Sequence, residues 1–174
     1  MEINRIQIEF VSGKLSDYAA DAYVLPYYPH HVNPDNERQD VELAGARGVR
    51  SFIEHRLRQN INHDQPSMGD VKITESQGGK SRMLVNMICR SKDPEQRAIA
   101  IARGLLGMLL YSGRYNLQHV AMSPLCVCDG LSENDFAEIL RNSLQNCPSG
   151  HSIRKITVVC KDKAQSSKFE HILE

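Results

Sequence analysis

Hydrophobic positions recur along the chain with two different periods, and each change of period marks a new element. Residues 3–11 alternate, with Ile6, Ile8 and Phe10 on one face, which is typical of a strand. Residues 71–74 alternate as well, and a glycine pair at 78–79 predicts an antiparallel hairpin with the strand that follows. Short continuous apolar runs predict strands buried on both faces, at 22–26, 83–89, 119–124 and 155–160.

Helical spacing separates these strands. It predicts helices over 49–57 and from near Asp93, Ser132 and Asp162, each of the last three a capping residue. At the Asp93 helix, Pro94 suits the first position and Gln96 completes a capping box, and Gly113 is expected to end the helix. The apolar stripe expected to be buried comprises Ala98, Ile99, Ala102, Leu105, Leu106, Leu109 and Leu110.

Apolar strands that alternate with amphipathic helices predict an α/β fold, a three-layer α/β/α sandwich with a mixed, mostly parallel sheet. No repeat or linker divides the sequence, so we expect residues 1–174 to form a single domain. Ligands of such sheets bind at the carboxyl ends of the parallel strands. Those ends are expected at Tyr27, at Cys89, over 124–130 and at Cys160.

Composition narrows the functional classes. The 174 residues carry 21 Lys plus Arg and 21 Asp plus Glu, and this zero net charge argues against a dedicated nucleic-acid-binding protein. No apolar run approaches the roughly 18–20 residues of a membrane span, and the N-terminus lacks a signal-peptide core. The five cysteines are odd in number, which favours reduced thiols and a cytoplasmic location.

Several groups of residues suggest chemistry that their spacing supports only weakly. Four cysteines, Cys89, Cys126, Cys128 and Cys160, fall near strand ends, but a single C-x-C pair is a poor zinc signal and packing is favoured. The adjacent pair His30-His31 would point in opposite directions, so we expect a solvated loop and no metal there. Neither a Walker loop nor a dinucleotide-binding glycine motif is present, and we expect no cofactor.

Aromatic and basic residues near the first strand end suit a nucleotide. Tyr27 and Tyr28 either stack on a base or close the core, two interpretations of equal weight. Arg38, Arg47 and Arg50 either bind phosphate or form a solvated helix face, which is favoured.

Taken with these elements, several short motifs resemble the macro domain, the fold that binds ADP-ribose and related nucleotides. The motifs are Val11-Ser12-Gly13-Lys14-Leu15, the Asp21-Ala22 entry to a strand, and the run from Gly69 to Thr74. The segments 84–88, 120–124 and 156–159 are similar to the later strands of the family. The N-terminal domains of leucyl aminopeptidases share a similar fold and serve assembly.

The ligand-binding motifs of that family are altered here. Lys14 stands where the family has an aspartate for the adenine amine, and a lysine cannot accept a hydrogen bond. The run 25–28 replaces the family's Asn-Ala-Ala-Asn, which removes its catalytic asparagine. The first glycine loop retains only Gly45 and Gly48, and in the second loop Asp129 would repel a diphosphate.

We therefore expect a divergent macro-domain-like binding module for an ADP-ribose-related nucleotide or another small anionic ligand, without efficient catalysis. The alternatives are an ADP-ribosyl hydrolase in which Asp35, Asp40 or Asp129 positions a water, and a non-catalytic assembly domain that forms an oligomer. Catalytic residues are not assigned. The candidate ligand-binding residues are Leu25, Tyr27, Tyr28, Gly45, Arg47, Gly48, Pro124, Cys126, Val127, Cys128, Asp129 and Gly130.

Overall fold

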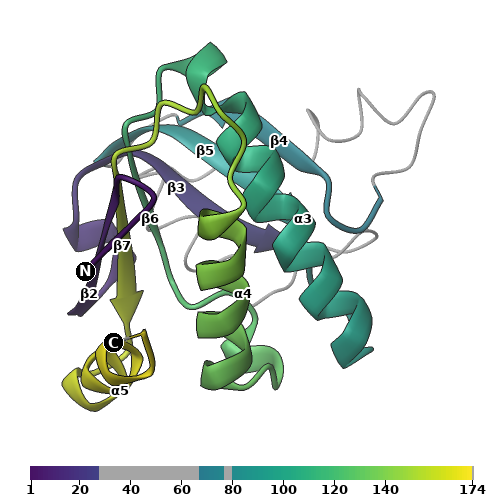
Figure 1. Cartoon of the computed structure of the whole chain (residues 1–174), viewed down its shortest axis with the longest axis vertical. Coiled ribbons are helices and arrows are strands. Elements are labelled where there is room, and N and C mark those ends of the chain that lie inside the picture. Colours follow the sequence, from purple (N-terminus) through teal and green to yellow (C-terminus); the bar gives the residue numbers. More distant parts are fainter. Residues whose placement is uncertain (28–66, 77–79, 174) are drawn as a thin grey trace.

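One mixed sheet of seven strands organises the computed structural model, which describes residues 1–27, 67–76 and 80–173 (Figure 1). The strand order is β1-β2-β7-β6-β3-β5-β4. Neighbours from β2 to β5 are parallel, and β1 and β4 add antiparallel edges, so the predicted mixed sheet and its hairpin are confirmed. The strands are β1 (Glu2–Ile3), β2 (Ile6–Ser12), β3 (Ala20–Tyr27), β4 (Val71–Glu75), β5 (Ser81–Ile88), β6 (His119–Met122) and β7 (Lys155–Cys160).

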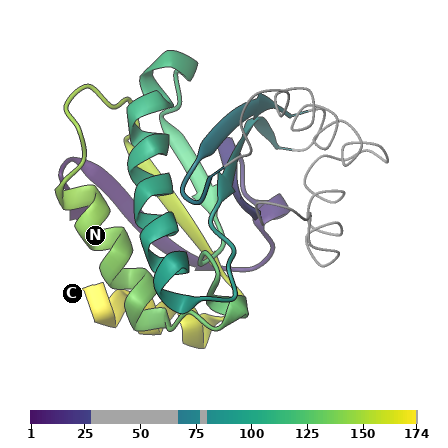
Figure 2. The same cartoon turned by 90° about the vertical axis from the view of Figure 1, so that its right-hand side faces the viewer.

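Three α-helices of the described residues pack on one face of this sheet. They are α3 (Pro94–Ser112), α4 (Glu133–Gln145) and α5 (Lys163–Leu173). Figure 2 shows α3 and α4 side by side against the strands. Three short 3-10 turns, η1 (Leu15–Asp17), η2 (Gly113–Tyr115) and η3 (Val127–Asp129), connect the elements. The helix predicted over 49–57 lies outside the described residues. Within the described part, no helix is long and apolar enough to cross a membrane.

The alternation of side chains along the strands produces two cores. Under the helices, Phe169 of α5 stacks on Phe10 of β2 with ring centroids 5.4 Å apart and meets Phe136 of α4 edge-on at 5.7 Å. The opposite face of the sheet carries a second cluster that includes Tyr23 and Tyr27. Both faces of the central strands are therefore apolar, as the continuous apolar runs predicted.

The strand predicted over residues 3–11 is two strands. Asn4 and Arg5 have φ of 50° and 66°, which forms a tight turn between β1 and β2. Two consecutive positive φ values match the right-handed twist of an antiparallel pair. The Asn4 side chain also donates to the Leu144 carbonyl at 3.2 Å, a tertiary bond that alternation alone does not reveal.

The predicted helix caps form. Asp93 Oδ1 accepts from the Glu95 N–H at 2.9 Å, Ser132 Oγ from Asp135 at 3.0 Å, and Asp162 Oδ1 from Gln165 at 2.8 Å.

One detail predicted for the start of α3 is wrong. The capping box is absent because the Asp93 N–H donates to Ser91 Oγ instead, and Gln96 also contacts that hydroxyl. Gly113 does follow the last residue of α3, as predicted, but its φ of −62° is helical, and the left-handed turn comes at Asn116, where φ is 52°.

The buried face of α3 is rotated from the predicted stripe. Ile99 and Leu110 are 53% and 63% exposed, whereas Ala100, Ile101, Leu105, Met108 and Leu109 are buried. Gly104 explains the rotation, because a Cβ there would lie 2.5 Å from the Met87 side chain of β5. The closest approach of helix and sheet is therefore centred on a glycine, and counting large apolar residues does not find it.

Candidate functional site

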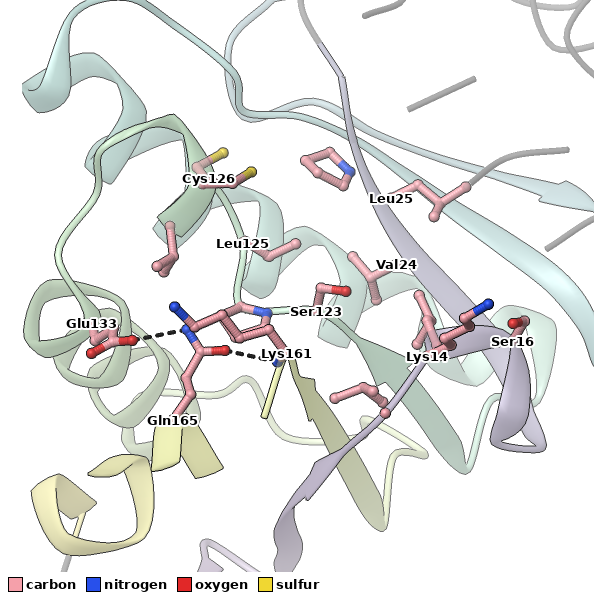
Figure 3. Close-up of a pocket in the computed structure, with 17 residues that line it drawn as sticks. Lys14, Ser16, Val24, Leu25, Ser123, Leu125, Cys126, Glu133, Lys161 and Gln165 are labelled. Atoms are coloured by element: carbon pink, nitrogen blue, oxygen red, sulfur yellow. Dashed lines mark hydrogen bonds between the residues drawn. The ribbon is translucent and has the colours of Figure 1, made fainter. Parts of the chain in front are cut away.

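A cleft of about 590 Å³ opens at the carboxyl ends of β2, β7, β6 and β3 (Figure 3). This is the edge at which parallel sheets bind ligands. Among the described residues, its lining comprises Gly13, Lys14, Leu15, Ser16, Val24, Leu25, Pro26, Ser123, Pro124, Leu125, Cys126, Val127, Cys128, Glu133, Val159, Lys161 and Gln165.

The cleft opens where two neighbouring strands separate. Pairing between β3 and β6 ends at Val24 and Met122, while β3 continues beside β5 as far as Tyr27. Pro26, which lies inside β3, and Pro124 each stand two residues beyond these last partners, and neither has an N–H to extend the ladder. Without these two donors, the β3–β6 ladder does not continue at the next register position.

The loop after β6 forms one wall through an unusual backbone. Cys126 has φ of 59° and Gly130 has φ of 93°. The Cys126 carbonyl accepts from the Asp129 and Leu131 N–H groups at 3.0 and 3.2 Å, which closes the turn. A left-handed residue that is not glycine costs free energy, so surrounding contacts must hold Cys126 in place. Its thiol is buried, with Sγ 3.7 Å from Cys89 Sγ.

Asp129 does not face the cleft, contrary to its predicted repulsion of a diphosphate. Its carboxylate forms an ion pair with Arg90 from the segment after β5, and Asp129 is not among the described lining residues. The two side chains are 14% and 4% exposed. The Arg90 guanidinium therefore balances the negative charge of Asp129, which was expected from the sequence to face the ligand. Gly130 also lies outside this lining.

Tyr27 belongs to the second core. It is 1% exposed, so its ring is not available to stack on a base and the core-closing interpretation fits it. Of the other candidate residues, Leu25, Pro124, Cys126, Val127 and Cys128 line the cleft. Tyr28, Gly45, Arg47 and Gly48 lie outside the described residues, as do His30, His31, Arg38 and Arg50.

The strand-end thiols are not arranged for metal or nucleophilic chemistry. Among the described residues, no three His, Cys, Asp or Glu side chains come together as a metal site requires. Contact with Cys126 and burial raise the pKa of Cys89 well above its usual range. Burial, followed by the charge of Asp129, raises the pKa of Cys128, and burial raises that of Cys160 to about 12. These three thiols are therefore protonated at neutral pH, and a thiol is a poor nucleophile.

Charged and amide side chains that sequence reasoning did not select complete the lining. Glu133 accepts from Gln165 Nε2 at 2.8 Å and pairs with Lys168 at 2.6 Å, and these hydrogen bonds lower the pKa of Glu133. Lys161 directly follows β7, and its backbone N–H donates to Gln165 Oε1 at 3.0 Å. Lys161 could have been selected from the sequence, because it directly follows the predicted strand end at Cys160, where ligands of such sheets bind.

Comparison with known proteins decides the fold. No protein-family model matches the chain, and no curated protein matches it in sequence. A variant of the Oceanobacillus iheyensis macrodomain, solved with ADPR, superimposes with a TM-score of 0.79 at 16% identity, over 99% of this chain and 95% of that one. The chain has the macrodomain fold.

Other macrodomains agree. The Trypanosoma brucei macrodomain in complex with ADP-ribose has a TM-score of 0.72 at 13% identity, over 96% of this chain and 69% of that one. The macro domain of ganglioside induced differentiation associated protein 2 has a TM-score of 0.71 at 14% identity, with coverages of 96% and 84%. These likenesses confirm the predicted macrodomain fold and leave the ligand to the chemistry of the cleft.

Proposed function

We propose that this macrodomain-like chain is a binding module that holds a small anionic, nucleotide-type ligand related to ADP-ribose in its strand-end cleft. The observation that carries the proposal is the cleft itself. Its volume of about 590 Å³ lies within the range of small-molecule sites, and it is lined by two lysines and one already paired glutamate. Solved macrodomains of the same fold hold ADPR, ADP-ribose or ADP.

The loop after β6 suits a phosphate on backbone grounds. Successive residues near a left-handed position turn their N–H groups toward one concavity, and such concavities attract anions. Cys126 supplies that position, and Cys126, Val127 and Cys128 line the cleft. The N–H groups of Val127 and of residues 129–131 donate to carbonyls of the same loop, so an anion would meet the remaining donors of this wall. Because Asp129 is paired with Arg90, its carboxylate does not oppose an anion at this wall.

Binding without efficient catalysis is supported by the state of the reactive groups. The hydrolase alternative needs a carboxylate to position water, but Asp129 is bound to Arg90 and Glu133 to Lys168. Asp35 and Asp40 lie outside the described residues. The assembly alternative would favour an apolar, closed strand-end cleft, whereas two lysines enter this one.

Isothermal titration calorimetry with ADP-ribose and with ADP tests the proposal. The macro-domain resemblance implies that Lys14 forfeits one charge-assisted hydrogen bond to adenine, about 1.5–3 kcal/mol. That is one to two decades of affinity, so a site that would otherwise bind ADP-ribose at about 10⁻⁶ M is expected to have a dissociation constant of about 10⁻⁵–10⁻⁴ M. Ser123→Phe should fill the cleft and abolish the heat, whereas Ser149→Phe, in the exposed loop after α4, should not.

Two results would contradict this function. Absence of heat from the wild-type chain at millimolar ligand would remove the nucleotide proposal. Equal binding by Ser123→Phe, shown to be folded by its thermal transition, would place the ligand elsewhere on the molecule.

A further inference from the structure

Two of the buried thiols lie in contact with each other across the end of β3. Cys89 directly follows β5, Cys126 lies in the loop after β6, and their Sγ atoms are 3.7 Å apart. In the sheet, β5 and β6 flank β3, and the Cys89 N–H donates to the carbonyl of Tyr27, the last residue of β3, at 3.1 Å. Cys89 and Cys126 are 0% and 1% exposed, so bulk water does not separate the two sulfurs.

The surrounding structure keeps the two sulfurs together. Arg90, the next residue, forms an ion pair with Asp129 of the loop after β6, so the same two segments are joined a second time. Cys126 Sγ also lies 3.7 Å from the Cys89 carbonyl oxygen. A disulfide has an S–S bond of about 2.0 Å, so the sulfurs need to approach by about 1.7 Å. Rotation of the two side chains and a small shift of the loop, whose hydrogen bonds join residues 124–131 to one another, are enough for this approach.

We propose that Cys89 and Cys126 are a redox switch, in which a hydroperoxide converts the two thiols into a disulfide and a thiol reductant restores them. Cys126 forms part of the cleft wall (Figure 3), so the bond fixes this wall to the segment after β5. Cys126 has φ of 59°, a conformation that its surroundings must support, and a covalent bond adds to that support. The inference concerns the state of the thiols and does not depend on which ligand the cleft binds.

The oxidation balances with hydrogen peroxide as the oxidant. Cys126 Sγ, on the cleft side, attacks one peroxide oxygen, which breaks the O–O bond and leaves a sulfenic acid and one water. Cys89 Sγ then attacks the Cys126 sulfur, the S–S bond forms, and the sulfenic oxygen leaves as a second water. The sulfurs lose two electrons to the peroxide, and both thiol protons end in the waters. Contact with Cys126 and burial hold the pKa of Cys89 well above its usual range, so its deprotonation limits the second step.

Peptide mass spectrometry of the full chain tests the switch, after treatment with hydrogen peroxide in native buffer and trapping of free thiols with N-ethylmaleimide in denaturant. We expect a linked pair of peptides that holds Cys89 and Cys126 and that dithiothreitol separates. The linked protein should unfold at a higher urea concentration than the reduced protein, because the bond restricts the unfolded chain. The linkage should form faster as the pH is raised from about 7 to about 9, because the thiolate is the attacking species.

Single substitutions assign the linkage. Cys89→Ser and Cys126→Ser should each abolish both the linked peptides and the gain in urea resistance, measured against the reduced form of the same variant. Cys160→Ser is the matched control, since it removes another buried thiol at a strand end and should leave both effects. Cys128→Ser, which removes the exposed thiol of the same loop, should also leave both.

Three results would overturn the switch. The first is that Cys89 and Cys126 are both trapped as free thiols after peroxide has oxidised Cys128. The second is that Cys126 is linked to Cys128 or to Cys147 instead. The third is a link between Cys89 and Cys126 that forms only when urea has unfolded the chain, because the native contact would then play no part in it.

Discussion

The ion pair between Arg90 and Asp129 joins the segment after β5 to the loop after β6 at the carboxyl end of the sheet. Both side chains are largely buried, and Arg97 fixes the start of the same segment by donating twice to the Ser91 carbonyl, at 3.0 and 2.8 Å. Removing one partner of a buried pair leaves the other charge poorly solvated, so the pair matters more for stability than surface pairs do.

Asp129→Asn should lower the free energy of unfolding by about 3–5 kcal/mol, because the Arg90 guanidinium stays buried without its counter-charge. Urea denaturation followed by circular dichroism measures the change. Lys168→Gln is the matched control, since it breaks an exposed pair and should cost at most about 1 kcal/mol. Similar losses in the two variants would contradict the importance of burial.

His119 supports a pH prediction on the sheet face opposite the helices. Its Nε2 lies 2.8 Å from Thr157 Oγ1, which donates to Glu9 at 2.6 Å. Burial, followed by the charge of Lys155, lowers the pKa of His119 below 6.5, against the opposing charges of Glu9 and Asp21. The unfolded chain therefore takes up the proton first, and stability is lost as the pH falls from 6.5 through the folded pKa.

His119→Gln, which keeps a polar group near Thr157, should match the wild type at about pH 7.5 and lose less stability by about pH 5. The free energy of unfolding, measured at both pH values, checks this. Glu9 does not interfere, because burial raises its pKa less than Lys155 and Thr157 lower it, so its contribution fades only below 4.5. Parallel loss in the two proteins would refute the assignment to His119.

Single residues also show which side-chain contacts could be predicted from the sequence and which could not. Asp93, Ser132 and Asp162 could be predicted as caps because each partner lies two or three residues away. Asp129 could not be placed, because its partner is 39 residues distant and the pair exists only once β5 and β6 share a sheet. A contact between residues a few positions apart can be predicted from the sequence, whereas a contact that depends on tertiary structure cannot.

At the scale of elements, α3 and β5 meet at Gly104. The sequence pattern selected the leucines and turned the helix so that Ile99 and Leu110 faced inward, whereas both are exposed. Hydrophobic spacing predicted the presence of α3, and Asp93 with Pro94 predicted its first residue. The face that contacts the sheet depends on where the Met87 side chain leaves room.

Gly104 and Gly107 offer a matched pair of substitutions within this helix. Alanine gains about 0.5–1 kcal/mol of helix preference over glycine at either position. A Cβ at Gly107 would meet Val71 at an ordinary 3.4 Å, so Gly107→Ala should stabilise the protein. A Cβ at Gly104 would lie 2.5 Å from Met87, and Gly104→Ala should cost about 1–3 kcal/mol through overpacking.

Urea denaturation of both variants gives the comparison, and each serves as the control for the other. Stabilisation by Gly104→Ala would show that Met87 repacks without strain and that the glycine does not set the face of α3.

At the scale of the whole molecule, the reactivity of each cysteine shows how much of the fold must unfold before that thiol is exposed. Cys89, Cys126 and Cys160 are buried at the ends of β5, β6 and β7, while Cys128 is exposed. These strands are central in the sheet, so exposing the buried thiols requires loss of the main core.

Labelling with iodoacetamide, followed by mass spectrometry, should modify Cys128 first in native buffer. The three buried cysteines should react at a rate that follows global unfolding and rise together as urea is added. Cys128→Ser should remove the first reaction, leave an intermediate reaction at the half-buried Cys147, and leave the three late ones unchanged. Early modification of Cys89 would show that its strand end opens locally.

The sheet and the position of its cleft could be predicted because both follow from general rules, alternation of strands with helices and binding at carboxyl ends. Which side chains enter the cleft could not. Lys161 was passed over because its place in the cleft depends on β7 lying beside β2, and these strands are far apart in the sequence. Thr157 of β7 and Glu9 of β2, which share a hydrogen bond, are 148 residues apart.

Pairing between β3 and β6 stops two residues before a pair of prolines, Pro26 and Pro124, and this gives the cleft tolerance of side-chain change. Two prolines at the next register position cannot donate to an extended ladder, whichever side chains surround them. The lysines, serines and leucines around the cleft can therefore be replaced during evolution while the cleft itself persists, and the ligand that it binds can change with them. Identities of 13–16% at TM-scores of 0.71–0.79 are what such drift would leave behind. The backbone preserves a place to bind, and the rim decides what is bound.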